Sequence, residues 1–306
     1  MMFRRPRVAV AALFAFAPAF LLAQRGYPPN LPDARVETYK RVGGVELKMW
    51  IYTPEGHRAS DRRPAIVFFF GGGWRGGTPL QFAPHARYLA SRGMVAFLAD
   101  YRVASRHGAK VTDCVEDAKS AVRWVRANAA RLGVDPDRIA AAGGSAGGHL
   151  AAATAIVPDL EAKGEDQRVS SAPNALVLFN PVLVLAPVEG GPEWPKEKAE
   201  MLRQRAGSDP TLVSPYHHLR KGLPPAITFH GKADKTVPYE TAEFFCRKMK
   251  SLGNRCELVG YDGVGHGFFN YGRGDGKAYF DTLRRADRFL ASLGWLKGEP
   301  TLPGSP

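Results

Sequence analysis

The sequence predicts an α/β fold in which helices flank a mostly parallel β-sheet. Three observations support this prediction. Several short runs are apolar throughout, as strands buried on both faces are. These runs alternate along the chain with segments whose apolar residues recur at helical spacing. Strands that alternate with helices are typical of crossover connections between parallel strands, so the sheet is expected to be mostly parallel.

The first expected strand is VELKMWIY at 45–52, where apolar and polar residues alternate as in a half-exposed antiparallel strand. We expect two antiparallel strands to lead into the sheet. Continuously apolar runs then predict buried strands at 65–70, 94–100, 138–144, 174–181, 225–231 and 256–262.

Helices are expected between the later strands, at 113–132, 147–157, 239–252 and 277–293. In the first of these segments, Asp113 is a suitable N-cap and Gly133 a suitable end. Gly253 is expected to end the third helix in the same way.

The first 23 residues are predicted to be a secretory signal peptide. Arg4, Arg5 and Arg7 precede an apolar run at 8–23, and Ala23 is a small residue at the expected cleavage site. The alternative is a membrane anchor, but this run is short for a span of about 20 residues. The sequence therefore predicts a secreted or periplasmic protein with no stable membrane insertion after cleavage.

The remaining chain is expected to form one large domain. Residues 24–33 are rich in proline and predict an extended leader, 34–296 predict the α/β domain, and 297–306 a tail. Residues 182–222 interrupt the alternation of strands and helices. A connection of that length predicts a cap or lid beside a functional site, with a solvated excursion as the alternative.

The chain is strongly basic, with 42 Lys and Arg against 29 Asp and Glu and a formal net charge of +13. Such a charge favours acidic substrates, anionic envelope surfaces or nucleic acid. No basic block interleaved with aromatic residues is present, so we expect no binding to nucleic acid. A basic surface without a dedicated partner is the simpler interpretation, and the oligomeric state is left open.

The chain has three cysteines, Cys114, Cys246 and Cys256. Cys246 and Cys256 lie on an expected helix and at the start of the next strand, and are a plausible pair in an oxidising compartment. Spacing alone does not establish their geometry, so three buried thiols are the alternative. Three cysteines at these spacings do not fit a zinc site, and no metal is expected.

Residues 143–147 have the sequence GGSAG and stand between an expected strand and an expected helix. In that context G-x-S-x-G predicts a nucleophile elbow, a tight turn that exposes the serine Oγ at the edge of the sheet. Small neighbours let the turn close, and the positive end of the next helix points toward the same place. Ser145 is therefore the predicted nucleophile, with a glycine-rich linker as the alternative.

A serine nucleophile needs a base, and the base needs a carboxylate to orient it. In this architecture the acid and then the histidine follow the serine, at the ends of later strands. Asp234 and His266 occupy such places. Asp262, four residues before His266, is the alternative orienting acid.

The other histidines are expected to have other roles. His149 and His230 are predicted to pack in the core. The adjacent pair His217 and His218 could line a pocket. Ordinary loop or helix positions are expected for His57, His85 and His107.

Residues 68–74, FFFGGGW, place three glycines directly after a buried strand. Glycine lets backbone N–H groups face a substrate without obstruction. We expect the N–H groups of Gly72, Gly73 and Ala146 to form an oxyanion hole, in which each donor is worth about 10²–10³ in rate. Trp74 is expected to wall the pocket and contact substrate, with core packing as the alternative.

Taken together, these segments resemble the α/β-hydrolase fold, and within it the esterase/lipase branch. The GGGW, GGSAGGH and HGKAD segments are similar to those of secreted bacterial acetyl xylan and feruloyl esterases, over about residues 35–295. The resemblance implies an eight-stranded sheet with a short cap insertion, and catalysis by Ser145, Asp234 and His266 without cofactor. One departure is Phe70, which stands where the family usually has histidine before the glycines, so the support of the loop is in question.

The resemblance also implies a substrate. It indicates a secreted serine carboxylesterase acting on small-molecule or polysaccharide esters, with acetyl or feruloyl groups on plant polysaccharide as the expected substrates. Two alternatives are another hydrolase of this fold, such as a peptidase or an arylformamidase, and a catalytically silent binding protein. Only Phe70 favours the silent protein.

Overall fold

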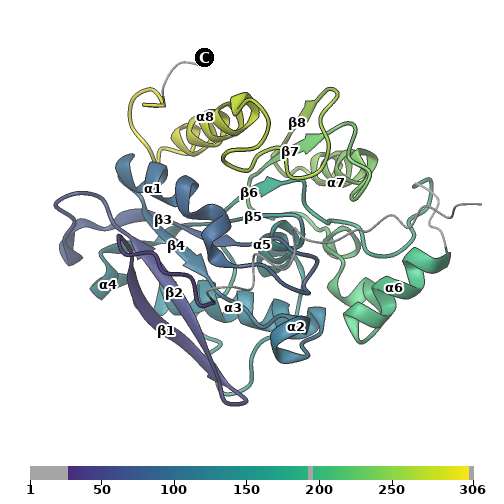
Figure 1. Cartoon of the computed structure of the whole chain (residues 1–306), viewed down its shortest axis with the longest axis horizontal. Helices are drawn as coiled ribbons and strands as arrows, with labels where there is room; N and C mark the ends of the chain where they lie inside the picture. Colours follow the sequence, from purple (N-terminus) through teal and green to yellow (C-terminus); the bar gives the residue numbers. More distant parts are fainter. Residues whose placement is uncertain (1–26, 192–195, 303–306) are drawn as a thin grey trace, which may run out of the picture.

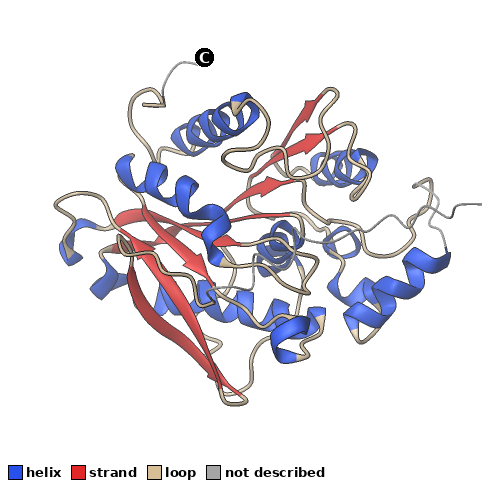
Figure 2. Ribbon diagram, viewed as in Figure 1, coloured by secondary structure: helices blue, strands red, loops and turns tan. Residues whose placement is uncertain are grey.

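The computed structural model describes residues 27–191 and 196–302 and has three layers, with a β-sheet between two layers of helices (Figures 1 and 2). The sheet has eight strands in the order β1-β2-β4-β3-β5-β6-β7-β8. Both pairings of β2 are antiparallel and all other pairings are parallel. This confirms the predicted fold class, including the antiparallel entry. The strands are β1 Arg35–Val42, β2 Val45–Tyr52, β3 Arg63–Phe69, β4 Val95–Ala99, β5 Val134–Gly144, β6 Ala175–Phe179, β7 Ala226–Gly231 and β8 Cys256–Tyr261.

Helices cover both faces of the sheet (Figure 1). One face packs against α1 and α8, and the other against α3, α5 and α7. The helices are α1 Ala83–Ser91, α2 Ala104–His107, α3 Val111–Ala127, α4 Ala129–Leu132, α5 Ala146–Ile156, α6 Lys196–Ala206, α7 Tyr239–Ser251 and α8 Lys277–Ser292.

Burial on both faces explains why the central strands are apolar throughout. In β3, Val67 and Phe69 belong to the hydrophobic cluster that contains α3 and α5. Ile66 and Phe68 belong to the cluster that contains α1 and α8. Because successive side chains of a strand point to opposite faces, a strand covered on both sides is apolar at nearly every position.

The helix predicted at 113–132 differs from the structure in two ways. It is divided at Asn128 into α3 and α4, and α4 ends at Gly133 in the left-handed conformation, as expected. The N-cap is Lys110 and not Asp113, whose carboxylate instead accepts a 2.8 Å hydrogen bond from the Lys110 N–H. Asp113 therefore stabilises the first turn from its third position, which is the other half of a capping box.

The segment at 182–222, predicted to be a cap, contains α6 and two short 3₁₀ turns, Pro210–Val213 and Pro215–His218. α6 lies at the edge of the molecule in Figure 1, with Leu202 and Ala206 buried against the core. That this segment forms a cap over the site stays a prediction.

The two ends of the chain are described only in part. The predicted signal peptide lies outside the described residues. The described part of the predicted leader packs on the domain, where Leu31 is buried and the Tyr27 hydroxyl donates to Asp100. No helix in the described ranges is long and apolar enough to cross a membrane.

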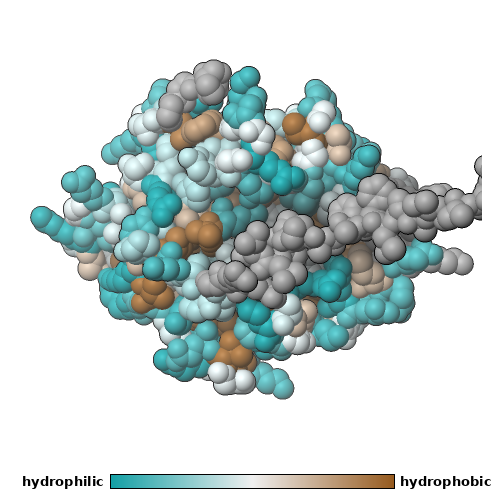
Figure 3. All heavy atoms as spheres, viewed as in Figure 1, coloured by the Kyte–Doolittle hydropathy of each residue, from teal (hydrophilic) through white to brown (hydrophobic). Residues whose placement is uncertain are grey.

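The face of the molecule seen in Figure 3 is mostly hydrophilic, with small separate hydrophobic patches. A disulfide joins Cys246 on α7 to Cys256 at the start of β8, which is one of the two alternatives that the sequence left open, and their Cα atoms are 5.4 Å apart. Cys114 is a buried free thiol on α3.

The turn between β5 and α5 depends on small residues. Ser145 has φ 54° and ψ −119°, a backbone conformation that costs about 1–3 kcal/mol in a non-glycine residue. A Cβ on Gly147 would lie 2.0 Å from the carbonyl oxygen of Phe69 and 2.4 Å from that of Phe70. α5 therefore reaches the end of β3 only because this position has no side chain.

We expect Gly147→Ala to lower the free energy of unfolding by about 1–3 kcal/mol, because backbone atoms that cannot rotate away must shift. Urea unfolding followed by circular dichroism measures the change. Gly76→Ala is the matched control, since a Cβ there meets only the Ser105 Oγ at 3.7 Å. Equal stabilities of the two variants would contradict the steric account.

Candidate active site

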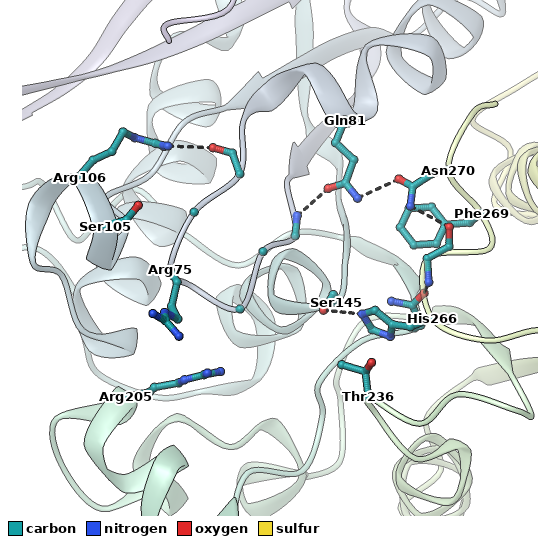
Figure 4. Close-up of a pocket in the computed structure, with 17 residues that line it drawn as sticks. Arg75, Gln81, Ser105, Arg106, Ser145, Arg205, Thr236, His266, Phe269 and Asn270 are labelled. Carbon is teal, nitrogen blue, oxygen red and sulfur yellow. Dashed lines mark hydrogen bonds between the residues drawn. The ribbon is translucent and has the colours of Figure 1, made fainter. Parts of the chain in front are cut away.

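Ser145, His266 and Asp234 come from three separate segments and form one hydrogen-bonded row. Ser145 lies between β5 and α5, Asp234 follows β7, and His266 follows β8. Nε2 of His266 is 2.9 Å from the Ser145 Oγ, and Nδ1 is 2.7 Å from Oδ2 of Asp234 (Figure 4 shows the first of these contacts). The structure thus brings together the three residues that the sequence predicted.

Asp234 is held as an ionised acceptor. Its Oδ1 accepts hydrogen bonds from the backbone N–H groups of Thr236 and Val237, at 2.8 and 2.9 Å. Burial by itself raises the pKa of Asp234, but the contacts with His230 and His266 and the bond from Val237 N–H outweigh it. The net pKa is well below the usual 3.8. An ionised carboxylate can only accept, so Nδ1 of His266 carries the proton and Nε2 is free to accept from Ser145.

The alternative orienting acid is excluded by its position. Asp262 is exposed and forms an ion pair with Lys232, 2.8 Å between carboxylate and ammonium. The described structure shows no contact between Asp262 and His266.

The glycine loop after β3 lies against Ser145. A Cβ on Gly71 would be 3.3 Å from the Ser145 Cβ. Gly72 and Gly73 have φ of 129° and 62°, which glycine adopts without strain, and both line the cavity at Ser145. Their N–H groups have no acceptor among the described residues, and Ala146 supplies the first N–H of α5. Two of the three predicted donors thus line the same cavity as the serine, and the third follows it directly in the chain.

A chain of side-chain amides, which the sequence analysis missed, joins this loop to the histidine loop. Gln81 Oε1 accepts from the Gly71 N–H at 2.6 Å, and Gln81 Nε2 donates to Asn270 Oδ1 at 2.9 Å (Figure 4). Asn270 Nδ2 in turn donates to the Gly267 carbonyl at 2.8 Å. Gly267 follows His266 directly, so the chain sets the spacing between the glycine loop and the imidazole.

The glycine loop is held at Phe70 by contacts that differ from those of the histidine usual at this position. Its ring stacks on Tyr101 with the centroids 4.1 Å apart, and the Tyr101 hydroxyl donates to the Phe70 carbonyl at 2.7 Å. Nη1 of Arg106 donates to the Gly77 carbonyl at 3.0 Å on the far side of the loop. Aromatic packing and these two hydrogen bonds hold the loop in place.

The expected position of Trp74 in the pocket wall needs correction. The indole is 4% exposed and is absent from the lining of the cavity at Ser145. Its Nε1 donates to His149 Nδ1 at 3.1 Å, and His149 Nε2 lies 2.7 Å from the Val213 carbonyl. Trp74 thus packs behind the glycine loop, together with the core histidine His149, because a buried indole needs an acceptor for its N–H.

His85 also differs from expectation. It is not an ordinary helix residue but is fully buried among aromatic rings, 4.9 Å from Tyr279 and 5.0 Å from Phe82 between centroids. Burial lowers the pKa of His85 to about 3, so the ring is neutral. His217 and His218 bond within their own segment and do not line the cavity at Ser145.

Ser145 lines a cavity of about 770 Å³. Phe269 and three arginines, Arg75, Arg106 and Arg205, also line it. A second cavity of about 670 Å³ adjoins it across Gln81 and Asn270. We call this second cavity the apolar arm, because its lining includes the exposed Leu80 and Tyr271. Within the described ranges, no group of three or more His, Cys, Asp or Glu is placed to hold a metal ion.

Comparison with known proteins gives a consistent picture. The BD-FAE family model matches residues 49–249, and the dienelactone hydrolase family model matches residues 207–297. Esterase LipC of Mycobacterium tuberculosis is 30% identical over 230 residues, which cover 67% of this chain and 53% of LipC. Carboxylesterase NlhH of the same species is 29% identical and covers 82% of this chain and 81% of its own length. The chain spans about half the length of the first curated relatives it matches.

Among solved structures, that of Thermogutta terrifontis esterase 2 phosphonylated by sarin is 58% identical, with a TM-score of 0.87. The match covers 89% of this chain and 99% of that one. The same esterase in its native form is 59% identical, with a TM-score of 0.85. The BD-FAE model matches more than half of the length of this chain. The chain therefore belongs to the BD-FAE family, among the esterases of the α/β-hydrolase fold.

Proposed function

We propose that this chain is a serine carboxylesterase that hydrolyses short acyl esters through an acyl-enzyme. Ser145 is the nucleophile, His266 the general base and Asp234 the orienting acid. The observation that supports this most strongly is the row of contacts from Ser145 Oγ through His266 to Asp234, at 2.9 and 2.7 Å. The glycine loop lies next to this row of contacts, and the N–H groups of Gly72 and Gly73 have no acceptor in the described structure.

The proposed reaction has two halves. The Ser145 Oγ attacks the ester carbonyl while Nε2 of His266 takes the hydroxyl proton, and the oxyanion accepts from Gly72, Gly73 and Ala146. The C–O bond to the alcohol breaks as Nε2 returns the proton to the leaving oxygen. Water then attacks the acyl-enzyme with the same base, which releases the acid and restores the serine.

Two further observations support the acyl class and the covalent step. Thermogutta terrifontis esterase 2 has been solved with propionate and with butyrate bound, which favours short acyl groups. It has also been solved phosphorylated by paraoxon and phosphonylated by sarin, reagents that react with activated nucleophiles.

The finer proposal is that the acyl groups are acetyl or feruloyl on plant polysaccharide, hydrolysed outside the cytoplasm. The resemblance of the GGGW and GGSAGGH segments and the match to the BD-FAE family support this choice. The signal peptide predicted at 1–23 supports secretion or export to the periplasm.

Ser145→Ala is expected to lower kcat for p-nitrophenyl acetate and methyl ferulate by at least about 10⁴-fold, because no other nucleophile is present at that position. Release of p-nitrophenol and of ferulate measures both reactions. Paraoxon should label the original protein at Ser145, as located by peptide mass spectrometry, and should not label the variant. Hydrolysis that survives in a folded variant would rule out Ser145 as the nucleophile.

Asp234→Asn is expected to lower kcat by about 10⁴-fold, because the amide favours the wrong tautomer of His266. Asp262→Asn is the matched control, and its kcat should stay within about twofold, as for a surface change. Similar losses in the two variants would contradict the assignment of the orienting acid.

Asp234 also predicts a pH dependence of stability. Its folded pKa lies below the unfolded value of about 3.8, so the ionised carboxylate stabilises the fold at neutral pH. That contribution is lost as the pH falls below about 4, toward the folded pKa. The difference in unfolding free energy between the original protein and Asp234→Asn should therefore shrink on acidification, measured by urea unfolding at pH 7 and at pH 3. A constant difference would contradict the lowered pKa.

Gln81→Leu is expected to lower kcat by about 10–100-fold with a smaller change in KM, because the glycine loop and the imidazole lose their common support. Gln167→Leu is the control, since Gln167 is exposed and does not line the cavity at Ser145. Steady-state kinetics with p-nitrophenyl acetate separate the two parameters. A rise in KM alone would mean that Gln81 binds substrate and does not position the loop.

A further inference from the structure

Arg75 and Arg205 lie together on one side of the cavity at Ser145. Arg75 follows the glycine loop, and Arg205 belongs to the last turn of α6. Both also line a side cavity of about 300 Å³, which Lys110 shares. A Cβ on Gly73 would be 3.5 Å from Nη1 of Arg205, so this guanidinium lies against the proposed oxyanion hole. Figure 4 shows the two arginines next to each other, away from Asn270 and Phe269.

These two arginines have no anionic partner within the part of the chain that the structure describes. Other partly buried arginines are engaged, with carboxylates as Arg92 is with Asp287 at 2.6 Å and Arg102 with Asp117 at 2.7 Å, or with backbone carbonyls as Arg126 is. For Arg75 and Arg205, no described residue forms an ion pair or side-chain hydrogen bond, and no Asp or Glu of the described chain lines either cavity.

Arg106, the third arginine of the cavity, is different because it is already engaged. It donates to the Gly77 carbonyl, lies 3.9 Å from the centroid of the Tyr27 ring, and has Nη2 3.9 Å from an Asp100 oxygen. Its charge therefore belongs to the support of the loop.

Two positive charges held together without an anion repel each other, and partial burial weakens the screening by water. The pKa of Arg205 is lowered, first by burial and second by the charge of Arg75. An anion between the two groups would relieve both effects. The planar guanidinium matches a carboxylate or a phosphate in two parallel hydrogen bonds, and of these two groups we take the carboxylate as the ligand.

We propose that Arg75 and Arg205 form a subsite for a carboxylate carried by the ester substrate, so that anionic esters are preferred over neutral esters of similar shape. This inference rests on the proposed function of Ser145, since it concerns the substrate of that same site. The carboxylate belongs either to the acyl part or to the alcohol part of the ester, and the experiment distinguishes the two.

Two matched substrate pairs provide the test. 4-Acetoxybenzoate and its methyl ester differ by a charge in the alcohol part, and monomethyl glutarate and methyl pentanoate differ by a charge in the acyl part. The measured quantity is the ratio of kcat/KM for the anionic member to that for the neutral member. Product release is followed by chromatography or by pH-stat titration.

In Arg75→Gln and in Arg205→Gln, we expect this ratio to fall by about 10-fold for at least one pair, mainly through KM, as on loss of one charge-assisted contact. Added salt should lower the ratio in the original protein, because it screens the attraction. Arg203→Gln, an exposed position on the same helix, is the charge-matched control and should leave the ratio unchanged. The pair that responds identifies the part of the ester that carries the carboxylate.

A binding measurement separates this inference from the proposed function. Calorimetric titration of Ser145→Ala with 4-acetoxybenzoate and monomethyl glutarate needs no catalysis, and adding Arg205→Gln should weaken the binding of one of them about 10-fold. If the original protein hydrolyses no ester but the arginines govern this binding, the proposed function fails and the anion subsite stands. Unchanged ratios and unchanged binding in both arginine variants, or equal effects of Arg203→Gln, would overturn the inference.

Discussion

The close approach of α5 to the end of β3 is the constraint on which the active site depends. The backbone at Gly147 lies so near the carbonyls of Phe69 and Phe70 that not even a methyl group fits. That contact places the serine turn and the glycine loop, which leave two neighbouring strands, within reach of one carbonyl group. It also holds Ser145 in its strained backbone conformation, because the helix and the strand on either side fix where the turn begins and ends. The proposed nucleophile and oxyanion donors are therefore set by packing of the backbone before any side chain takes part.

Side chains then complete what the backbone contact begins. Asp234 and His266 arrive on the loops after β7 and β8, and the buried carboxylate fixes which ring nitrogen carries the proton. The Gln81–Asn270 amides connect the glycine loop to the histidine loop, although the two residues are 189 positions apart. The family that the sequence resembles usually has a histidine before the glycines to support this loop. In this chain Phe70 stands there, and Tyr101 supports the loop through ring stacking and a hydrogen bond to the Phe70 carbonyl.

The parts of the fold that can be predicted are those that depend on short stretches of sequence. The buried strands have continuous apolar runs, and Ser145, Asp234 and His266 stand at strand ends that topology brings to one edge of the sheet. The sequence does not locate the first strand, β1, because it is partly exposed and shows no clear alternation. It does not indicate α6 either, because that helix is polar on most of its surface. Trp74 was misplaced because its position depends on an acceptor, His149, that lies 75 residues away. Gln81 and Asn270, and likewise Arg75 and Arg205, are far apart in the sequence and meet only in the folded chain. The sequence therefore does not indicate that they lie together.

The two arms of the cavity have a consequence for divergence among related esterases. The apolar arm and the arginine side meet only at Gly71, Gly72, Gly77, Gln81 and Asn270, which contribute backbone and amide groups. Other residues line only one of the two cavities, Leu80 and Tyr271 the apolar arm and Arg75 and Arg205 the cavity at Ser145. If the anion subsite holds, substitutions at Leu80 or Tyr271 therefore change the space for bulk, and substitutions at Arg205, on α6, change the charge that a substrate meets.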